Sequence, residues 1–364
     1  MNFDYNEEQQ LLADSVRRFL QKDYEFEARK KIVGAGHSEK VWGAFAEMGL
    51  TGIPFSPDFG GFGGGAVDLM SVMEAFGEGL VVEPFLATLL GAHCVARAGS
   101  EAQRKAVLPG VVEGKVKMAF AFSEKGARYD LEPSAVKAKK AGSGWTLDGE
   151  KVVVLGAPAA AKIIVTAQAP AGPSLFLVDA KAVKMKPYVT LDEMRAADVV
   201  FTGTPAELLG VEGKALPVIE EVVDLGTALI CAEAVGAMKF SCDTTLEFLK
   251  TRKQFGVPIG TFQALQHRMV DMVVAYEQAK SMACLACSKV DGAVDAKERA
   301  RAVSAAKIKI ADNARLISQE AIQLHGGMGM SEELKVSHSF RRLTMIAQQF
   351  GDADHHLERF ARLG

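Results

Sequence analysis

The segment from Arg252 to Gly256, R-K-Q-F-G, places a cation, an aromatic ring and a glycine close together. A guanidinium is planar and permanently charged, so Arg252 suits phosphate oxygens better than a lysine would. The ring of Phe255 can pack on a planar group, and Gly256 lets the backbone turn sharply after a helix. Taken alone, Arg252 is more simply explained as a solvated charge at a helix end.

A second segment, Q-L-H-G-G-M-G from Gln323 to Gly329, changes this balance. With both segments in one chain, phosphate binding is favoured over the solvated charge.

A third segment, Pro54 to Gly65, has too much glycine and proline for a helix, and its glycines allow turns or a close approach to a ligand. A structural turn is favoured there over a phosphate cradle.

The five cysteines are an odd set scattered over the chain, which argues against a disulfide framework and for a reducing compartment. Cys284 and Cys287 form a C-x-x-C without a second pair of ligands. Two helical thiols are therefore favoured over a metal or redox site.

Composition narrows the class of protein. The chain has 364 residues, 49% hydrophobic and 24% charged, with a formal net charge of -3. It can bury a large core, and nucleic acid is not expected as a partner. The N-terminus has no secretory pattern, and no apolar run approaches the roughly 20 residues of a membrane span. These features predict a cytoplasmic protein.

The periodicity of apolar residues predicts three domains that position these groups: residues 1–116 helical, 117–211 β, and 212–364 a bundle of four or five helices. The long helices of the last domain favour oligomerisation through their outer faces. The clearest helix is predicted over residues 295–324. An antiparallel barrel or sandwich is predicted for the β-domain. Its expected strands are Trp145–Leu147, Lys151–Leu155, Ile163–Thr166, Ser174–Val178 and Asp198–Phe201.

This order of domains resembles the acyl-CoA dehydrogenase family through nearly the whole chain. Gly99 to Lys115 is similar to the family's link into the β-domain, and Ser123 to Asp130 looks like a degraded copy of its T-E-P-x-A-G-S-D flavin loop. Thr251 to Met272 resembles its R-x-x-F-G…Q signature, and Ala321 to Glu333 its helix and loop at the dinucleotide.

The resemblance implies non-covalent FAD. It implies that Arg252 and Phe255 reach the FAD of a neighbouring subunit, that Gln323 and Gly327 line its pyrophosphate, and that the Ser123 hydroxyl bonds the flavin ring. The cofactor-binding residues expected on this basis are Ser123, Arg252, Phe255, Gln263, Gln323, Gly326, Gly327 and Asp352.

Two features depart from the family pattern near the flavin. The W-I-T element that packs the isoalloxazine corresponds to Val153-Val154-Leu155, so the aromatic ring and the hydroxyl are both missing. Tyr129 replaces a small serine. Flavin is therefore expected to bind in an altered way, or at only some interfaces.

A further departure concerns the catalytic base. Dehydrogenation needs a carboxylate to remove the α-proton of the thioester while hydride leaves the β-carbon. The family usually places this glutamate where Phe350 stands here, and its other location corresponds to Gly226, followed by Thr227. The catalytic residues of this chain are therefore unknown.

Two neighbouring carboxylates are candidate substitutes for the base. Glu233 lies about two turns along the same helix, and Asp352 flanks the final turn, although an N-cap is the simpler role for this aspartate. His355 and His356 are favoured as surface or interface residues over a catalytic pair with an aspartate.

Three functions remain open. The leading one is an FAD-dependent acyl-CoA dehydrogenase subunit that works with a homologous partner and an electron acceptor, similar to the small subunit of the heteromeric pimeloyl-CoA dehydrogenase-like enzymes. The second is a flavoenzyme of the same fold with other chemistry on a CoA thioester. The third is a structural subunit that has lost flavin.

Overall fold

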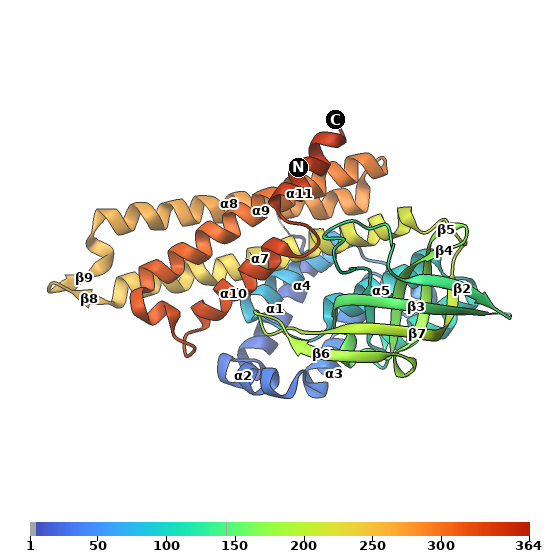
Figure 1. The fold of residues 1–364 in the computed structure, drawn as a ribbon. Coiled ribbons are helices and arrows are strands. Elements are labelled where there is room, and N and C mark those ends of the chain that lie inside the picture. The colour runs from blue at the N-terminus through green and yellow to red at the C-terminus, as the bar shows by residue number, and fades with distance from the viewer. Residues whose placement is uncertain (1–4, 143) are drawn as a thin grey trace. The chain divides into compact units, whose positions relative to one another are not determined.

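The computed structural model describes residues 5–142 and 144–364 (Figure 1). Helices precede and follow a central β-region, which confirms the order expected from the sequence. The α-helices are α1 (Glu7–Asp23), α2 (Phe26–Ala35), α3 (Glu39–Glu47), α4 (Ala66–Gly79), α5 (Phe85–Ala98), α6 (Glu101–Val112), α7 (Leu216–Thr251), α8 (Gln263–Gly292), α9 (Ala296–His325), α10 (Lys335–Gln348) and α11 (Ala353–Arg362).

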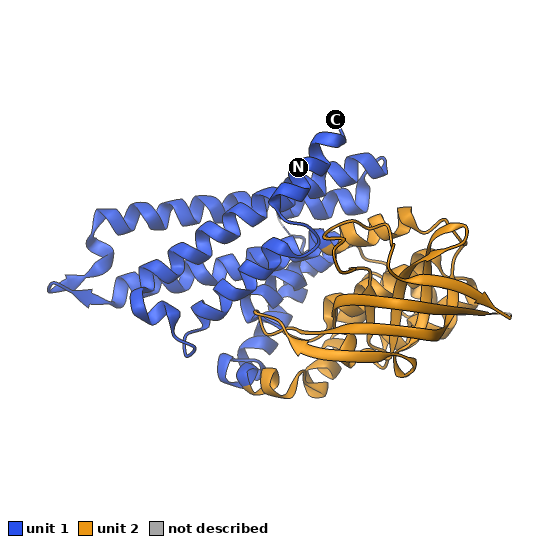
Figure 2. Cartoon of the chain, viewed as in Figure 1, with its two compact units in different colours: residues 1–30, 66–81, 227–364 blue, residues 31–65, 82–226 orange. Residues whose placement is uncertain are grey.

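Contacts divide the chain into two compact units, each built from segments that are far apart in sequence (Figure 2). The helical unit comprises the described residues up to Lys30, then Ala66–Val81 and Thr227–Gly364. The sheet unit comprises Lys31–Gly65 and Val82–Gly226. The three-domain division at residues 116 and 211 stays a prediction.

The long helices of the helical unit begin and end where the sequence provides caps. Asp295 accepts the N–H of Glu298 at the start of α9, and α9 ends at His325 with Gly326 as its C-cap, whose φ of +61° suits a glycine. The helix predicted over residues 295–324 is thereby confirmed. Figure 1 shows α8 and α9 side by side, and the amide of Asn313 on α9 donates to the Ala275 carbonyl on α8 at 2.7 Å.

Two glycines let α4 and α7 pack with their backbones in contact. A Cβ on Gly77 would lie 1.9 Å from the Glu233 carbonyl oxygen, and a Cβ on Gly236 would lie 1.8 Å from that of Glu74. Neither position has room for a side chain. The packing of the helical unit around α7 depends on both residues.

The strands of the sheet unit form a seven-stranded sheet with the order β1-β4-β2-β3-β7-β5, in which β6 pairs with β7 and β4 also pairs with β5. The pairings close a ring through a single residue pair, Lys137 with Gln168. The strands are β1 (Met118–Ala121), β2 (Lys137–Ala141), β3 (Gly144–Leu155), β4 (Lys162–Ala169), β5 (Gly172–Asp179), β6 (Lys184–Val189) and β7 (Arg195–Leu209).

The expectation of a purely antiparallel sheet is wrong for two pairings. β1 and β2 both pair with β4 in parallel, whereas the other pairs in the sheet are antiparallel. Apolar alternation along a strand records which face a residue occupies, and it carries no information about the direction of the neighbouring strand.

The predicted strands are found, with three additions. Trp145–Leu147 and Lys151–Leu155 are parts of one bent strand, β3. The sequence interpretation missed β1, β2 and β6. β2 and β6 are rich in exposed lysines, K-A-K-K-A and K-M-K-P-Y-V, which lack the apolar alternation that marks a strand.

The structure also bears on the expectations for the cysteines, the Pro54 to Gly65 loop and membrane-spanning helices. The five cysteines are buried and form no disulfide. In the Pro54 to Gly65 segment, a Cβ on Gly61 would lie 2.1 Å from the Phe55 carbonyl oxygen, so the loop packs on its own backbone. Among the described residues, no helix has the length and apolar content that crossing a membrane requires.

We expect Gly236→Ala to lower the free energy of unfolding by about 1–3 kcal/mol or more, because the added methyl group overlaps the backbone of α4. Gly43→Ala in α3 is the matched control, since a Cβ there meets no atom within 4 Å. It should raise stability by about 0.5–1 kcal/mol. Urea unfolding measures both, and equal effects would contradict the close-packing interpretation.

Candidate functional site

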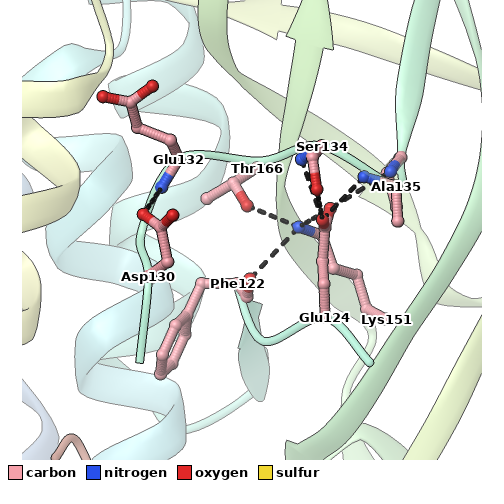
Figure 3. Close-up of polar contacts among 9 residues, drawn as sticks. Phe122, Glu124, Asp130, Glu132, Ser134, Ala135, Lys151 and Thr166 are labelled. Atoms are coloured by element: carbon pink, nitrogen blue, oxygen red, sulfur yellow. Dashed lines mark hydrogen bonds and ion pairs between the residues drawn. The ribbon is translucent and has the colours of Figure 1, made fainter. Parts of the chain in front are cut away.

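Ser123 lies in the loop after β1, and the buried side chain of Glu124 anchors this loop (Figure 3). One carboxylate oxygen of Glu124 accepts the N–H groups of Ser134 and Ala135 at 2.8 and 2.7 Å. The other oxygen accepts the N–H of Val136 at 3.1 Å. Glu124 therefore ties the Ser123 loop to the segment that leads into β2.

Lys151 on β3 completes this network (Figure 3). Its ammonium group donates to Glu124 Oε1 at 2.8 Å, to Thr166 Oγ1 at 2.7 Å and to the Phe122 carbonyl at 3.2 Å. Burial lowers the pKa of Lys151 to about 8, against the effect of Glu124. Burial acts to raise the pKa of Glu124, but hydrogen bonds from Lys151 and from the Ala135 N–H outweigh it and lower the value to about 2. Both groups are charged at neutral pH.

Directly after Lys151, β3 leaves regular strand geometry. The pairing register with β7 shifts between Lys151 and Val154, and Val153 has a φ of +53°. The N–H of Val152 leaves the ladder and donates to the Ser123 carbonyl at 3.0 Å. The Val153-Val154-Leu155 element therefore begins beside the Ser123 loop, with the side chain of Val153 exposed.

Arg252, Phe255 and Gln263 lie between the end of α7 and the start of α8. Arg252 follows the last residue of α7, and its N–H donates to the Phe248 carbonyl at 2.8 Å. Phe255 is in the turn between β8 (Lys253–Gln254) and β9 (Val257–Pro258), with a side chain that is 90% exposed. Gln263 is the first residue of α8, and its side chain is also exposed.

Gln323, Gly326 and Gly327 lie at the end of α9, near the end of α7. The contact that brings the two helix ends together is a stacked pair, the rings of Phe248 and His325, whose centroids are 4.4 Å apart. Burial lowers the pKa of His325, so the neutral imidazole packs there. A Cβ on Gly326 or Gly327 would meet no atom within 4 Å, so the backbone of this segment is open to a ligand.

The eight predicted cofactor-binding residues are thus found in three places. Six of them gather at one end of the helical unit: Arg252, Phe255, Gln263, Gln323, Gly326 and Gly327. Ser123 belongs to the sheet unit. Asp352 precedes α11, where its carboxylate accepts the His355 N–H at 2.8 Å as an N-cap. Their roles in cofactor binding remain predictions.

The turn between α10 and α11 contains Phe350 in a left-handed conformation, with a φ of +57°. Gly351 follows with a φ of +125°, and a Cβ on it would lie 2.6 Å from atoms of His355 and His356. Only glycine fits at position 351. Phe350 itself brings no group that can accept a proton.

Two buried basic side chains, Lys307 and His356, hold this turn by hydrogen bonds to its main-chain carbonyls. The ammonium group of Lys307 donates to the carbonyls of Gly351 and Ala347 at 2.6 and 3.1 Å. The Nε2 of His356 lies 3.2 Å from the Phe350 carbonyl, so this nitrogen carries the proton. Burial lowers the pKa of Lys307 to about 8, and burial together with the charge of Lys307 lowers the pKa of His356 to about 2.

The carboxylates considered as substitute bases are already engaged. Glu233 is buried, with Oε1 2.8 Å from Nε of the equally buried Arg342. Asp352 caps α11. Thr227 is buried within α7 and has no acidic group. His356 is buried within the chain, so its expected position at the surface or at an interface is wrong, and His355 is half-buried.

Sequence reasoning missed the residues that hold these segments in place. Lys151, Lys307 and Arg342 resemble surface charges in the sequence, and each is less than a twentieth exposed. Lys151 offered one local signal, because it directly precedes the apolar run V-V-V-L. Lys307 and Arg342 bind partners that are distant in sequence, which no local pattern records.

Comparisons with known proteins identify the family. The family model "Acyl-CoA dehydrogenase, N-terminal domain" matches residues 6–115, and "Acyl-CoA dehydrogenase, C-terminal domain" matches residues 213–363. The chain belongs to the acyl-CoA dehydrogenase family, and it is an oxidoreductase of the type that acts on CH–CH groups.

Three relatives illustrate the range of this similarity. The chain is 26% identical to a 3-(aryl)acrylate reductase of Clostridium sporogenes, over 96% of each chain. It is 29% identical to a solved variant of the Tcur3481-Tcur3483 steroid ACAD, with a TM-score of 0.88 over 98% of this chain and 97% of the other. It is 27% identical to the FAD complex of PigA, with a TM-score of 0.90 over 100% and 98%.

We expect Lys151→Met to destabilise the protein by about 3–5 kcal/mol, because it leaves the buried Glu124 carboxylate without its cation. Lys139→Met, at an exposed position on β2, is the control and should change stability by less than about 0.5 kcal/mol.

The Glu124–Lys151 pair also predicts that the stability of the fold depends on pH. The pKa of Glu124 in the folded state is about 2, below the usual 4.5, so its stabilisation is complete above pH 4.5 and is lost as the pH falls toward 2. Glu124→Gln should remove this part of the acid-induced loss of stability. Thermal unfolding between pH 2 and 6 measures it, and an unchanged pH slope in the variant would refute the assignment.

Proposed function

We propose that this chain is an FAD-dependent acyl-CoA dehydrogenase subunit that catalyses α,β-dehydrogenation of an acyl-CoA thioester together with a homologous chain that supplies the catalytic carboxylate. The observation that carries the proposal is the turn at Phe350. Phe350, at the position where the family places its glutamate, cannot accept a proton, and the two candidate substitutes, Glu233 and Asp352, are bound to other groups.

The cofactor is FAD, and the groups at the end of the helical unit suit it chemically. An exposed guanidinium matches a pyrophosphate, an exposed ring can pack on a base or flavin edge, and the backbone at Gly326 and Gly327 has open space for close approach. FAD, when bound, supplies the acceptor for the hydride that leaves the β-carbon. The FAD complex of the relative PigA supports this assignment.

We assign the other roles as follows. Arg252 and Phe255 bind the FAD of a neighbouring subunit, and Gln263, Gln323, Gly326 and Gly327 complete the dinucleotide site. Ser123 orients the ring system through its hydroxyl, and Asp352 lies at the cofactor's edge. A partner carboxylate removes the α-proton.

The proposed partner is a homologous chain. One relative is named as a pair, Tcur3481-Tcur3483, which supports a heteromeric assembly. The helical unit also presents exposed apolar side chains on the outer faces of its last helices, which suits a subunit contact. These residues are Val270, Val273 and Val274 on α8, Leu316 on α9 and Leu357 on α11. Within the family, we propose a place near the pimeloyl-CoA dehydrogenase-like small subunits, acting in fatty or dicarboxylic acid degradation and passing electrons to a separate acceptor.

A second candidate is a flavoenzyme with different chemistry on a related thioester. The similarity to a 3-(aryl)acrylate reductase supports it, because that relative is named for the reverse direction. A homotetramer with one FAD per chain that is inert on saturated acyl-CoAs would favour it. A colourless protein after reconstitution would favour a structural subunit instead.

We expect Arg252→Ala to reduce FAD occupancy strongly while leaving fold stability nearly unchanged, because the side chain is exposed and its guanidinium is assigned to the pyrophosphate. Lys253→Ala, the next residue and also exposed, is the control. FAD is measured by visible absorbance after reconstitution with the partner. A wild-type chain without a flavin band under these conditions would reject the cofactor assignment.

We expect the chain alone to show negligible dehydrogenation of straight-chain acyl-CoAs and the partnered assembly to recover it. Phe350→Glu should restore part of the activity of the unpartnered chain, since general-base catalysis contributes about 10²- to 10⁴-fold in rate. The rescue stays partial because Leu155 and Thr227 also depart from the family.

Bleaching of flavin absorbance by acyl-CoA without air measures this reaction, and light scattering measures the mass of each assembly. Phe350→Gln is the control, because it has nearly the same size as glutamate and accepts no proton. If the unmodified chain bleaches without a partner as fast as with one, a carboxylate of this chain reaches the α-carbon and the proposed division of labour is wrong.

A further inference from the structure

The bulge in β3 contains an unusual backbone conformation for a β-branched residue. Val153 has a φ of +53°, in a region that valine rarely adopts because its branched side chain crowds the backbone. The side chain is 48% exposed, so core packing does not hold it there. Such a conformation persists only when surrounding groups fix it.

Asp198 on β7 provides that constraint. It is the one residue of β7 between the partners of Lys151 and Val154, directly opposite the bulge. Its Oδ1 accepts the Val153 N–H at 3.2 Å and the Tyr188 hydroxyl at 2.9 Å. Tyr188 lies on β6, so three strands meet at this carboxylate. Burial and the neighbouring Asp198 raise the pKa of Tyr188 to about 12, and the hydroxyl therefore remains a donor.

The bulge also sets the position of Ser123. The two residues of β3 that face Asp198 direct their N–H groups to different partners, Val152 to the Ser123 carbonyl and Val153 to Asp198. Without the bond to Asp198, the strained φ of Val153 loses a constraint, and the peptide between Val152 and Val153 can rotate so that the Val152 N–H turns away from Ser123. The carboxylate of Asp198 therefore fixes Ser123 through the backbone of β3.

We propose that Asp198, oriented by Tyr188, is a positioning residue that shapes the flavin-binding surface formed by Ser123 and Val153. This inference rests on the proposed function, because it assigns FAD to that surface. Asp198 itself touches no cofactor in this scheme. It acts through the peptide of Val153.

The sheet unit contains a matched control. Asp148 on β3 accepts the Gly203 N–H at 2.7 Å, next to a second register shift between the same two strands. Like Asp198, Asp148 is a carboxylate that binds one backbone N–H where the pairing register of β3 with β7 shifts. The Ser123 loop binds β3 at Lys151 and Val152, on the other side of this shift.

The test measures the FAD dissociation constant by quenching of flavin fluorescence, in the reconstituted assembly and at a temperature where every variant is folded. We expect Asp198→Ala to weaken binding about tenfold or more, as the loss of one hydrogen bond to a charged group implies. Asp198→Asn keeps an acceptor oxygen and should stay within about threefold of wild type. Asp148→Ala should leave FAD affinity unchanged even where it lowers thermal stability.

Two further variants separate positioning from general stability. Val153→Gly in the Asp198→Ala background should restore most of the affinity, because glycine adopts positive φ without a constraint. Ser123→Ala and Asp198→Ala together should weaken binding less than the product of their separate effects, because both act through Ser123.

The outcomes distinguish the two proposals. If the wild type binds FAD and Asp198→Ala binds it equally well, the positioning role is overturned and the proposed function stands. The positioning role also fails if Asp148→Ala weakens binding as much, or if Val153→Gly restores nothing. A wild-type assembly that binds no FAD overturns both.

Discussion

Glu124 and Lys151 are buried together beneath a loop that has no regular secondary structure. Backbone N–H groups in such a loop need partners, and three of them, from residues 134 to 136, find one carboxylate. A buried ion pair is favourable only when its remaining hydrogen-bonding positions are filled, and here Phe122 and Thr166 fill those of Lys151. The position of Ser123, and of any group that it binds, depends on this pair.

In the helical unit, buried side chains likewise bind the backbone of an irregular segment, the turn between α10 and α11. Lys307 donates hydrogen bonds to two main-chain carbonyls, and His356 donates one to a third. In both units a buried lysine comes from a regular element, β3 or α9, and stabilises an irregular segment. Each lysine thus attaches an irregular segment to the regular element that carries the lysine.

The sequence was informative wherever the cause of the structure is local. The helix α9 could be predicted because its periodicity and its cap at Asp295 lie within one segment. Arg252 and Phe255 also come from one local segment, R-K-Q-F-G, and their role in cofactor binding stays a prediction. The bulge at Val153 could not be predicted, because its N–H is held by Asp198, a residue of another strand. The sequence also leaves Glu233 as a candidate base, because its ion pair with Arg342 joins two helices that are distant in the chain. Each of these contacts joins distant parts of the chain, and no periodicity encodes it.

At position 350, the backbone conformation of the turn between α10 and α11 is separate from the question of whether the side chain can accept a proton. A phenylalanine in the left-handed region is unfavourable compared with glycine, so the residue itself does not create the turn. The glycine at position 351 and the hydrogen bonds from Lys307 and His356 set the backbone there, and the Asp352 carboxylate caps the helix that follows. The hydrogen bonds at positions 350 and 351 both go to main-chain carbonyls, which any residue provides. Because these bonds need no carboxylate at position 350, they are compatible with the proposed division of labour, in which a partner chain removes the proton.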